Sequence, residues 1–332
     1  MASYHVLVVT NLWPTADDPG YGSFVQAQME SLHPLGVDFD VQFINGRASR
    51  WNYFRAVREL WRRLRSTRYH LIHAHFGLSG WVARCQLRVP VVVSFMGDDV
   101  LGRFARRGRI TFYGRLLRVS SWLLARLVGG VVVKSEEMRA TLGLPSARVI
   151  PNGVDLDLFR PMEQSEARRA LHLDPAKKFV LYPYDPAEQR KRFDLIEAAV
   201  ARARAAVPRL EILHVRGVPR ERMPLYINAA DVFVLASLAE GSPNALKEAM
   251  ATNLPVITVD VGDAARLVGL TPGCYIVPRE AEAIAQKIVE VCQAGERSRG
   301  REAIAHLAIG KVARQIVEVY TEALGRGAAI RQ

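Results

Sequence analysis

The segment EGSPNALKE places two carboxylates around the expected start of a helix. Glu240 comes just before that start and Glu248 lies inside the helix, so one could hold a sugar hydroxyl and the other a ribose diol. Ser242 is a suitable N-cap, and Pro243 suits the first helical position. Free amides at a helix start, aided by the helix dipole, favour a bound phosphate. The alternative is an ordinary capped helix with a solvated glutamate. The residues whose backbone belongs to this expected phosphate site are Gly241, Ser242, Pro243, Asn244, Ala245 and Leu246.

A second segment, YPYDPAEQRK, follows an expected strand and ends in a run of cations. Arg190 and Lys191 are candidates to stabilise the negative charge that builds on a departing diphosphate. A solvated basic loop is the alternative.

The loop NLWPTADDPGYGSF follows the first expected strand and precedes a helix. Gly22 and Ser23 could let the backbone approach a phosphate closely. The loop lacks GxGxxG, so the dinucleotide-binding fingerprint is absent. A purely structural turn is equally consistent with the sequence.

Two further motifs end expected strands. His73 and His75 share a strand face, and His75 lies at the carboxyl end. No further ligands lie at usable spacing, so we predict no metal there. Asp98 and Asp99 could accept hydrogen bonds from the hydroxyls of an acceptor, or one of them could cap a helix.

Short Val- and Ile-rich runs alternate with helical patterns, which predicts parallel, doubly wound α/β sheets. Because the pattern restarts after PNGVDLDLFRP (Pro151–Pro161), we expect an interdomain linker there and two Rossmann-like domains that face a cleft. The expected boundaries are 1–160 and 161–305, with a last helix in 306–332 that packs back on the first domain. The expected strands are His5–Thr10, Phe39–Ile44, Leu71–His75, Val89–Phe95, Gly130–Lys134, Arg148–Ile150, Phe179–Pro183, Leu210–Val215, Asp231–Ala236, Pro255–Asp260 and Tyr275–Val277. The expected helices include Gly22–Leu35, Trp51–Arg65, Arg109–Arg126, Arg192–Val207, Pro243–Thr252, Ala281–Val291 and Glu302–Leu324.

Composition narrows the class of protein. The chain has 332 residues, 49% hydrophobic and 23% charged, which excludes a disordered, collagen-like or disulfide-scaffold protein. The three cysteines fit neither a disulfide ladder nor a CxxC metal motif. We find no signal-peptide pattern and no uncharged apolar run of about 18 residues, so we expect a cytoplasmic protein.

The net charge of +12 lies mostly in the first part, which holds 21 basic and 12 acidic residues up to Arg160. Arg47–Arg68 and Arg103–Arg126 contain eight and seven arginines with interleaved aromatic residues. Such amphipathic helices are typical of docking on an anionic membrane, here the inner face of the plasma membrane. The alternative is a solvated face whose aromatic residues belong to the core. Nucleic acid is not expected, because no nucleic-acid-binding module accompanies the charge.

Taken together, the motifs resemble the retaining glycosyltransferases of family 4, which have the GT-B fold. The E-x7-E segment and its surroundings (Asn228–Asp263) are similar to that family's donor-site block. PNGVDLDLF is similar to its linker, and KRFDLIEAAV (Lys191–Val200) to the stretch after its diphosphate-binding lysine. The resemblance keeps the motif order over nearly the whole chain and is closest to teichuronic-acid-type and related cell-surface polysaccharide transferases.

The resemblance implies transfer of a hexose, with retention, from a UDP- or GDP-sugar to a hydroxyl of a glycan, lipid-linked or small-molecule acceptor. It implies no cofactor and no metal. By resemblance Lys191 contacts the diphosphate, Glu240 and His75 the sugar, and Glu248 the ribose, while His73 is a packed core histidine. The family's arginine, five residues before the lysine, is Pro186 here, so we take Arg190 as its substitute.

Two alternatives stay open from the sequence. One is an NDP-sugar epimerase or hydrolase on the same fold. The other is a basic membrane- or nucleic-acid-binding protein without catalysis. Two departures from the family pattern fit this alternative: the arginine is displaced, and VGDAAR lacks the glutamate that the family often has there.

Overall fold

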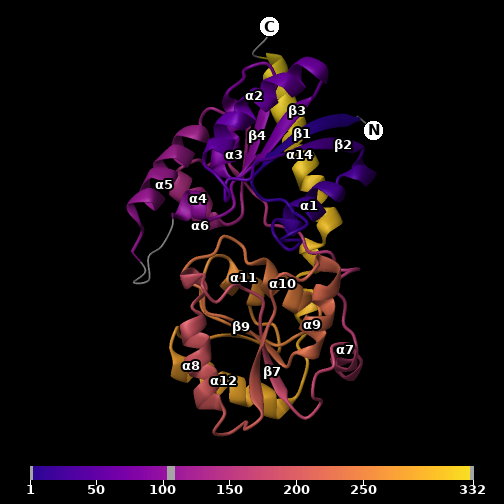
Figure 1. Ribbon diagram of the computed structural model, residues 1–332, viewed down its shortest axis with the longest axis vertical. Helices are drawn as coiled ribbons and strands as arrows, with labels where there is room; N and C mark the ends of the chain where they lie inside the picture. Colours follow the sequence, from indigo (N-terminus) through magenta and orange to yellow (C-terminus); the bar gives the residue numbers. More distant parts are fainter. Residues whose placement is uncertain (1–2, 103–108, 330–332) are drawn as a thin grey trace. The chain divides into compact units, whose positions relative to one another are not determined.

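The computed structural model describes residues 3–102 and 109–329 and forms two compact units (Figure 1). The described residues of the N-terminal unit are 3–102, 110–153 and the segment that begins at Ile309. The C-terminal unit runs from Val154 to Ala308. The division thus falls inside the predicted linker, but at Gly153 instead of after residue 160, and the returning segment begins three residues later than expected.

The sheet of the N-terminal unit has six parallel strands in the order β2-β1-β3-β4-β5-β6. Its central strands are buried on both faces, which explains their continuous Val and Ile runs. Thr10 pairs with His75 at the carboxyl ends of β1 and β3. The strands are β1 Tyr4–Thr10, β2 Val37–Phe43, β3 Leu71–His75, β4 Val91–Ser94, β5 Gly130–Val133 and β6 Arg148–Val149.

Helices cover this sheet, and the C-terminal helix α14, yellow in Figure 1, contacts β4 and β5. Val312, Ile316 and Tyr320 of α14 join one hydrophobic cluster with strand residues of the same unit. The helices of the N-terminal unit are α1 Ser23–Glu30, η1 His33–Leu35, α2 Trp51–Ser66, α3 Gly77–Arg84, α4 Asp98–Leu101, α5 Phe112–Leu124, α6 Glu136–Leu142 and α14 Ile309–Ala329.

The C-terminal unit has a five-stranded parallel sheet in the order β11-β10-β9-β7-β8. Two hydrophobic clusters, one around Phe233 and one around Val234, take alternate residues of its strands. The strands are β7 Lys178–Tyr182, β8 Leu210–His214, β9 Val232–Leu235, β10 Val256–Thr258 and β11 Cys274–Ile276. The helices are α7 Gln164–Ala170, η2 Gln189–Lys191, α8 Phe193–Ala203, η3 Arg220–Arg222, α9 Met223–Ala229, α10 Asn244–Ala251, α11 Ala264–Val268, α12 Ala281–Ala294, α13 Gly300–Ala303 and η4 Ala305–Leu307.

The predicted α/β class is confirmed, and the predicted elements are correct except at their ends. The helix expected over Glu302–Leu324 is three pieces, because the chain turns at Ile304 and Ala308 before α14 begins. The helix expected over Gly22–Leu35 ends at Glu30, and a 3-10 turn with Pro34 at its start follows. Residues 103–108 of the predicted basic stretch lie outside the described residues. Within the part of the chain that is described, no helix is both long and apolar enough to cross a membrane.

Candidate active site

Lys191 and Glu240 form a buried ion pair in the C-terminal unit. Lys191 Nζ lies 2.7 Å from Glu240 Oε1, and both side chains are less than a tenth exposed. Lys191 ends η2, in the loop after β7, and Glu240 lies in the loop after β9. Burial opposes ionisation of Glu240, but Lys191 and Arg190 outweigh it and hold the pKa of that carboxyl at about 2. Burial lowers the pKa of Lys191, and Glu240 acts in the opposite direction.

Arg190 reaches the same carboxylate from the other side. Its guanidinium lies 3.1 Å from Glu240 Oε2, donates to the carbonyl of Ala239 at 2.7 Å and pairs with Glu188 at 2.7 Å. The two cations that the sequence singled out therefore converge on one carboxylate. Arg190 thus reaches Glu240 beside Lys191, although it directly precedes the lysine and does not have the family's usual spacing of five residues.

The ring of Tyr184 covers one face of the Lys191 ammonium. Nζ lies 3.8 Å from the ring centroid, within the range of a cation–π contact. Tyr184 is part of YPYDPAEQRK, but sequence reasoning did not select it. No periodicity signals such a contact, which depends on how the loop folds back on Lys191.

Helix α10 begins at Asn244, and the predicted N-cap is wrong. Pro243 is the N-cap, so it cannot be the first helical residue, and no side chain caps the helix. The hydroxyl of Ser242 instead accepts a hydrogen bond from the buried Lys247 Nζ at 3.1 Å. The first-turn amides still lack partners within the helix, as at any helix start. Gly241, Ala245 and Leu246 lie in or directly before this turn, so an anion site there stays a prediction.

Glu248 lies one turn into α10 and is half-buried. Burial raises the pKa of its carboxyl, against the lowering effect of Arg220 and Lys247. The carboxylate makes no hydrogen bond with any residue that the structure describes, which leaves it available for a ligand hydroxyl. Arg220, in η3, is a neighbour that the sequence gave no reason to select.

In the N-terminal unit, the rings of His73 and His75 lie side by side with centroids 4.1 Å apart and a tilt of 36°, but they have different surroundings. His73 Nδ1 is 2.7 Å from the Tyr320 hydroxyl, and Nε2 is 2.8 Å from the Ser94 hydroxyl. Burial and the nearby charge of Lys134 lower the pKa of His73 to about 3. His75 is fully buried, and neither of its ring nitrogens has a hydrogen-bond partner among the described residues. His73 is thus a packed core histidine, and His75 has unsatisfied polar atoms at the end of β3.

Asp99 has a structural position, which favours the alternative of a capping role, and its contact with an acceptor stays a prediction. Its buried carboxylate accepts hydrogen bonds from the amides of Gly77 at 2.9 Å, Met96 at 3.0 Å and Gly97 at 2.9 Å. Burial raises its pKa to about 6, although these amides oppose the shift. Its carboxylate thus joins the loop after β3 to the loop after β4. Three amides already occupy the carboxylate, which leaves little of it for a ligand. Asp98 is half-buried in the first turn of α4, and its role stays a prediction.

Gly22 is required by its backbone. It has φ of +72°, and a Cβ there would lie 2.2 Å from the carbonyl carbon of Leu12. It precedes α1, of which the half-buried Ser23 is the first residue. The turn explains the glycine, so contact of Gly22 and Ser23 with a phosphate stays a prediction. Across the described part of the chain, no group of His, Cys, Asp and Glu residues is suited to hold a metal ion.

Comparison with known proteins identifies the class. Residues 2–158 match the family model "Glycosyltransferase Family 4", and residues 177–294 match "Glycosyl transferases group 1". The chain therefore belongs to the family 4 glycosyltransferases of the GT-B type. It is 27% identical to a putative teichuronic acid biosynthesis glycosyltransferase, TuaC, of Bacillus subtilis, over 85% of this chain and 88% of that protein. It is also 31% identical to the lipopolysaccharide core biosynthesis mannosyltransferase LpsB of Rhizobium meliloti, over 46% of this chain and 51% of that protein.

Solved structures with the same fold agree with this class. Sucrose-phosphate synthase from Thermosynechococcus elongatus superposes with a TM-score of 0.80 at 21% identity, covering 98% of this chain and all of that one. Anabaena HepE in complex with UDP-glucose superposes with a TM-score of 0.71 at 16% identity, covering 96% and 99%. At these identities the similarity shows the fold, and the predicted GT-B architecture is confirmed.

Proposed function

We propose that this glycosyltransferase transfers a hexose from a UDP- or GDP-sugar to a hydroxyl of a glycan, lipid-linked or small-molecule acceptor, with retention at the anomeric carbon. The observation that carries the proposal is the cluster in which the buried Lys191 and the half-buried Arg190 meet Glu240, which lies in the loop before α10. The complex of HepE with UDP-glucose and the names of TuaC and LpsB support a nucleotide-sugar donor and a role in cell-surface polysaccharide or glycolipid synthesis.

The cluster suits the departure of a diphosphate. Lys191 and Arg190 supply positive charge in a site where burial strengthens electrostatic interactions. The first-turn amides of α10 add the positive end of the helix dipole. Glu248, whose carboxylate no described residue engages, accepts hydrogen bonds from the ribose diol.

The reaction balances without a metal or cofactor. The bond between the anomeric carbon and the diphosphate oxygen breaks, and the acceptor oxygen forms its bond on the same face. The acceptor proton moves to a diphosphate oxygen, so the diphosphate leaves as the conjugate acid. Glu240 and His75 orient the sugar by accepting or donating hydrogen bonds to its hydroxyls.

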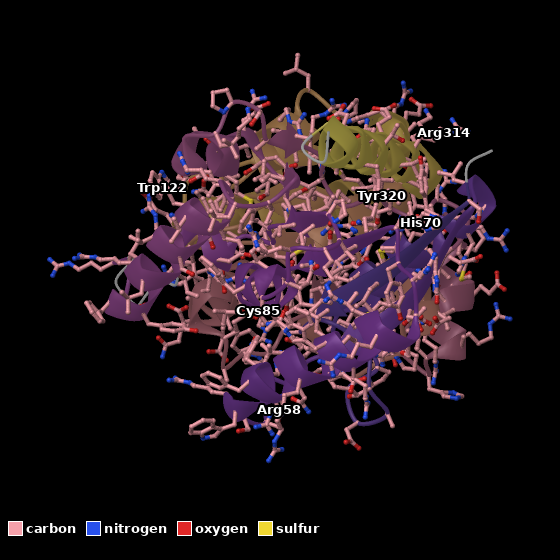
Figure 2. The ribbon with its side chains drawn as sticks, turned by 90° about the horizontal axis from the view of Figure 1, so that it is seen from above. Arg58, His70, Cys85, Trp122, Arg314 and Tyr320 are labelled. Atoms are coloured by element: carbon pink, nitrogen blue, oxygen red, sulfur yellow. The ribbon has the colours of Figure 1, made fainter. Side chains whose placement is uncertain are left out.

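We also propose that the N-terminal unit docks on an anionic membrane surface, which suits a lipid-linked acceptor. Trp51 and Phe54 of α2 are 70% and 68% exposed, and Phe112 and Leu116 of α5 are 77% and 52% exposed. The guanidinium of Arg50, just before α2, lies 5.9 Å from the ring centroid of Tyr113 in the first turn of α5, so side chains from the two helix starts approach each other. Figure 2 shows Arg58 of α2 and Trp122 of α5 at the edge of the view, whereas Tyr320 lies further in. The exposure of Trp51, Phe54 and Phe112 supports the proposal over a face whose aromatic residues pack in the core.

The proposal is tested by binding and turnover. Calorimetric titration with UDP, GDP and ADP should show one preferred nucleotide. The sugar conjugate of that nucleotide should then release the nucleoside diphosphate only when an acceptor is present. Proton NMR of the product should show the anomeric configuration of the donor, and activity should survive EDTA. Release without acceptor would favour a hydrolase or epimerase, and no nucleotide binding would favour the non-catalytic alternative.

A further inference from the structure

Lys191 has a well-defined set of neighbours. Its ammonium carries three N–H groups. One points to Glu240 Oε1 at 2.7 Å, and the Tyr184 ring, with its centroid at 3.8 Å, covers a second direction. No residue in the described part of the chain accepts a hydrogen bond from the third. The side chain is 8% exposed, so this remaining direction is narrow.

We propose that Tyr184 is a positioning residue that holds Lys191 so that its third N–H points to the donor diphosphate. The inference rests on the proposed function, because it assigns the diphosphate to Lys191. It adds a residue that contacts the lysine and that no motif of the sequence marks.

An aromatic ring differs from a carboxylate in what it does to the charge of a cation. The π face attracts the ammonium without neutralising it. Glu240 already has two cations beside it, Lys191 at 2.7 Å and Arg190 at 3.1 Å. Arg190 is also paired with Glu188 at 2.7 Å, so two carboxylates already face the two cations. A further carboxylate in place of Tyr184 would make the cluster net negative and would repel an anion. The ring therefore fixes Lys191 without adding negative charge beside it, so the ammonium can still donate to a bound anion.

The ring is itself held in place on several sides. Tyr184 packs against both hydrophobic clusters of the C-terminal unit. Its ring meets that of Tyr182 edge-on with centroids 5.5 Å apart, and its carbonyl lies 2.8 Å from His214 Nε2. Tyr182 also packs on Phe193, the first residue of α8, at 4.8 Å. The ring and the lysine are thus fixed by one aromatic cluster.

The hydroxyl of Tyr184 is not needed for this role. Burial and the charge of Glu240 raise the pKa of Tyr184 well above its usual value, so the hydroxyl stays protonated. It makes no hydrogen bond with any residue that the structure describes. Phenylalanine should therefore serve as well as tyrosine, whereas an aliphatic side chain should not.

The test is calorimetric titration of the full chain with UDP and with GDP. Tyr184→Phe should bind within about twofold of the wild type, and Tyr184→Leu should bind about tenfold more weakly. In the Lys191→Met background the change from Tyr184 to Leu should have no further effect, because there is no cation to hold. The affinity should fall as the pH rises and Lys191 loses its proton. Because the ring favours the charged lysine, this fall should begin at a lower pH in the Leu variant than in the wild type. Tyr184→Met, which fills similar space, repeats the measurement if the Leu variant unfolds.

Two results overturn the inference. One is a Leu variant that binds as tightly as the wild type. The other is an equal loss with and without Lys191, which would mean that the ring acts only on packing. Failure of the proposed function is distinguishable, because the wild type itself would then bind no nucleoside diphosphate.

Discussion

The ammonium of Lys191 lies 2.7 Å from a carboxylate oxygen of Glu240, 49 residues later in the chain, and both side chains are almost fully buried. Breaking a buried pair is costly because it leaves an uncompensated charge in a medium of low dielectric. The same pair presents a cation to the expected diphosphate. Stability and function therefore depend on the same contact. The contribution of this contact to stability should be measurable from its dependence on pH.

Glu240→Gln should lower stability in a pH-dependent way. In the folded protein the pKa of Glu240 is about 2, below its ordinary 4.5. The ionised carboxylate therefore stabilises the fold above pH 4.5, and this contribution is lost as the pH falls from 4.5 to 2. At pH 7 urea denaturation should show a loss of about 3 kcal/mol. The difference from wild type should shrink as the pH falls through that window.

The exposed pair of Lys177 and Glu211, also 2.7 Å apart, provides a matched control. Glu211→Gln should cost less than about 1 kcal/mol, because solvent screens exposed charges. Equal stabilities of the wild type and the Glu240→Gln variant at pH 7 would contradict the argument.

The neighbouring histidines of β3 should respond in opposite ways to substitution. His73→Leu leaves the buried hydroxyls of Tyr320 and Ser94 without their partner, so we expect a loss of about 2 kcal/mol of stability. His75→Leu removes two ring nitrogens that have no partner among the described residues, so stability should stay the same or rise. Turnover should fall in the His75 variant even though it is stable.

The pH dependence of turnover gives a second check on His75. Burial and the charges of its neighbours lower the pKa of His75 well below 6.5. The ring should therefore be neutral at pH 7. If turnover of the wild type shows a titration near pH 6.5, that titration should persist in the His75→Leu variant. A strongly destabilised His75→Leu protein would show that the ring has partners in solution.

How far the sequence predicts this site depends on the range of the interactions. The runs of Val and Ile are a local feature of the sequence, so they predicted the strands. The loops that the motif order indicates for chemistry stay a prediction. The predicted Ser242 cap is wrong because α10 begins one residue later, with Pro243 at the N-cap, and the Ser242 hydroxyl instead accepts from Lys247, five residues on. Nothing local distinguishes His73 from His75, since the distinction comes from Tyr320, 247 residues away. The outward orientation of Phe112 and Leu116 likewise depends on which face of α5 packs on the unit.

Glu248 should accept a hydrogen bond from the 2′-hydroxyl of the donor ribose. Its carboxylate is half-buried and has no described hydrogen-bond partner, so a hydroxyl would satisfy it. Wild-type protein should bind the 2′-deoxy form of the preferred nucleoside diphosphate about tenfold more weakly than the ribose form. In Glu248→Gln the ribose form should weaken and the difference between the two forms should largely disappear. Calorimetry with both nucleotides measures this, and a discrimination that survives in the variant would place the 2′-hydroxyl elsewhere.

Membrane docking should depend on both the apolar and the basic residues of α2 and α5. In vesicle sedimentation the wild type should bind phosphatidylglycerol-containing vesicles, and binding should fall with salt and be weak on phosphatidylcholine alone. Phe112→Ser together with Leu116→Ser should reduce binding, because both side chains are more than half exposed and lose their insertion energy. Arg58→Glu should weaken binding more than fivefold, since one basic residue near an anionic surface contributes about 1 kcal/mol. Leu270→Ser is the matched control, because Leu270 is fully exposed but belongs to the C-terminal unit. If the Leu270 variant loses as much binding as the α5 variant, the surface on α2 and α5 is not the docking site.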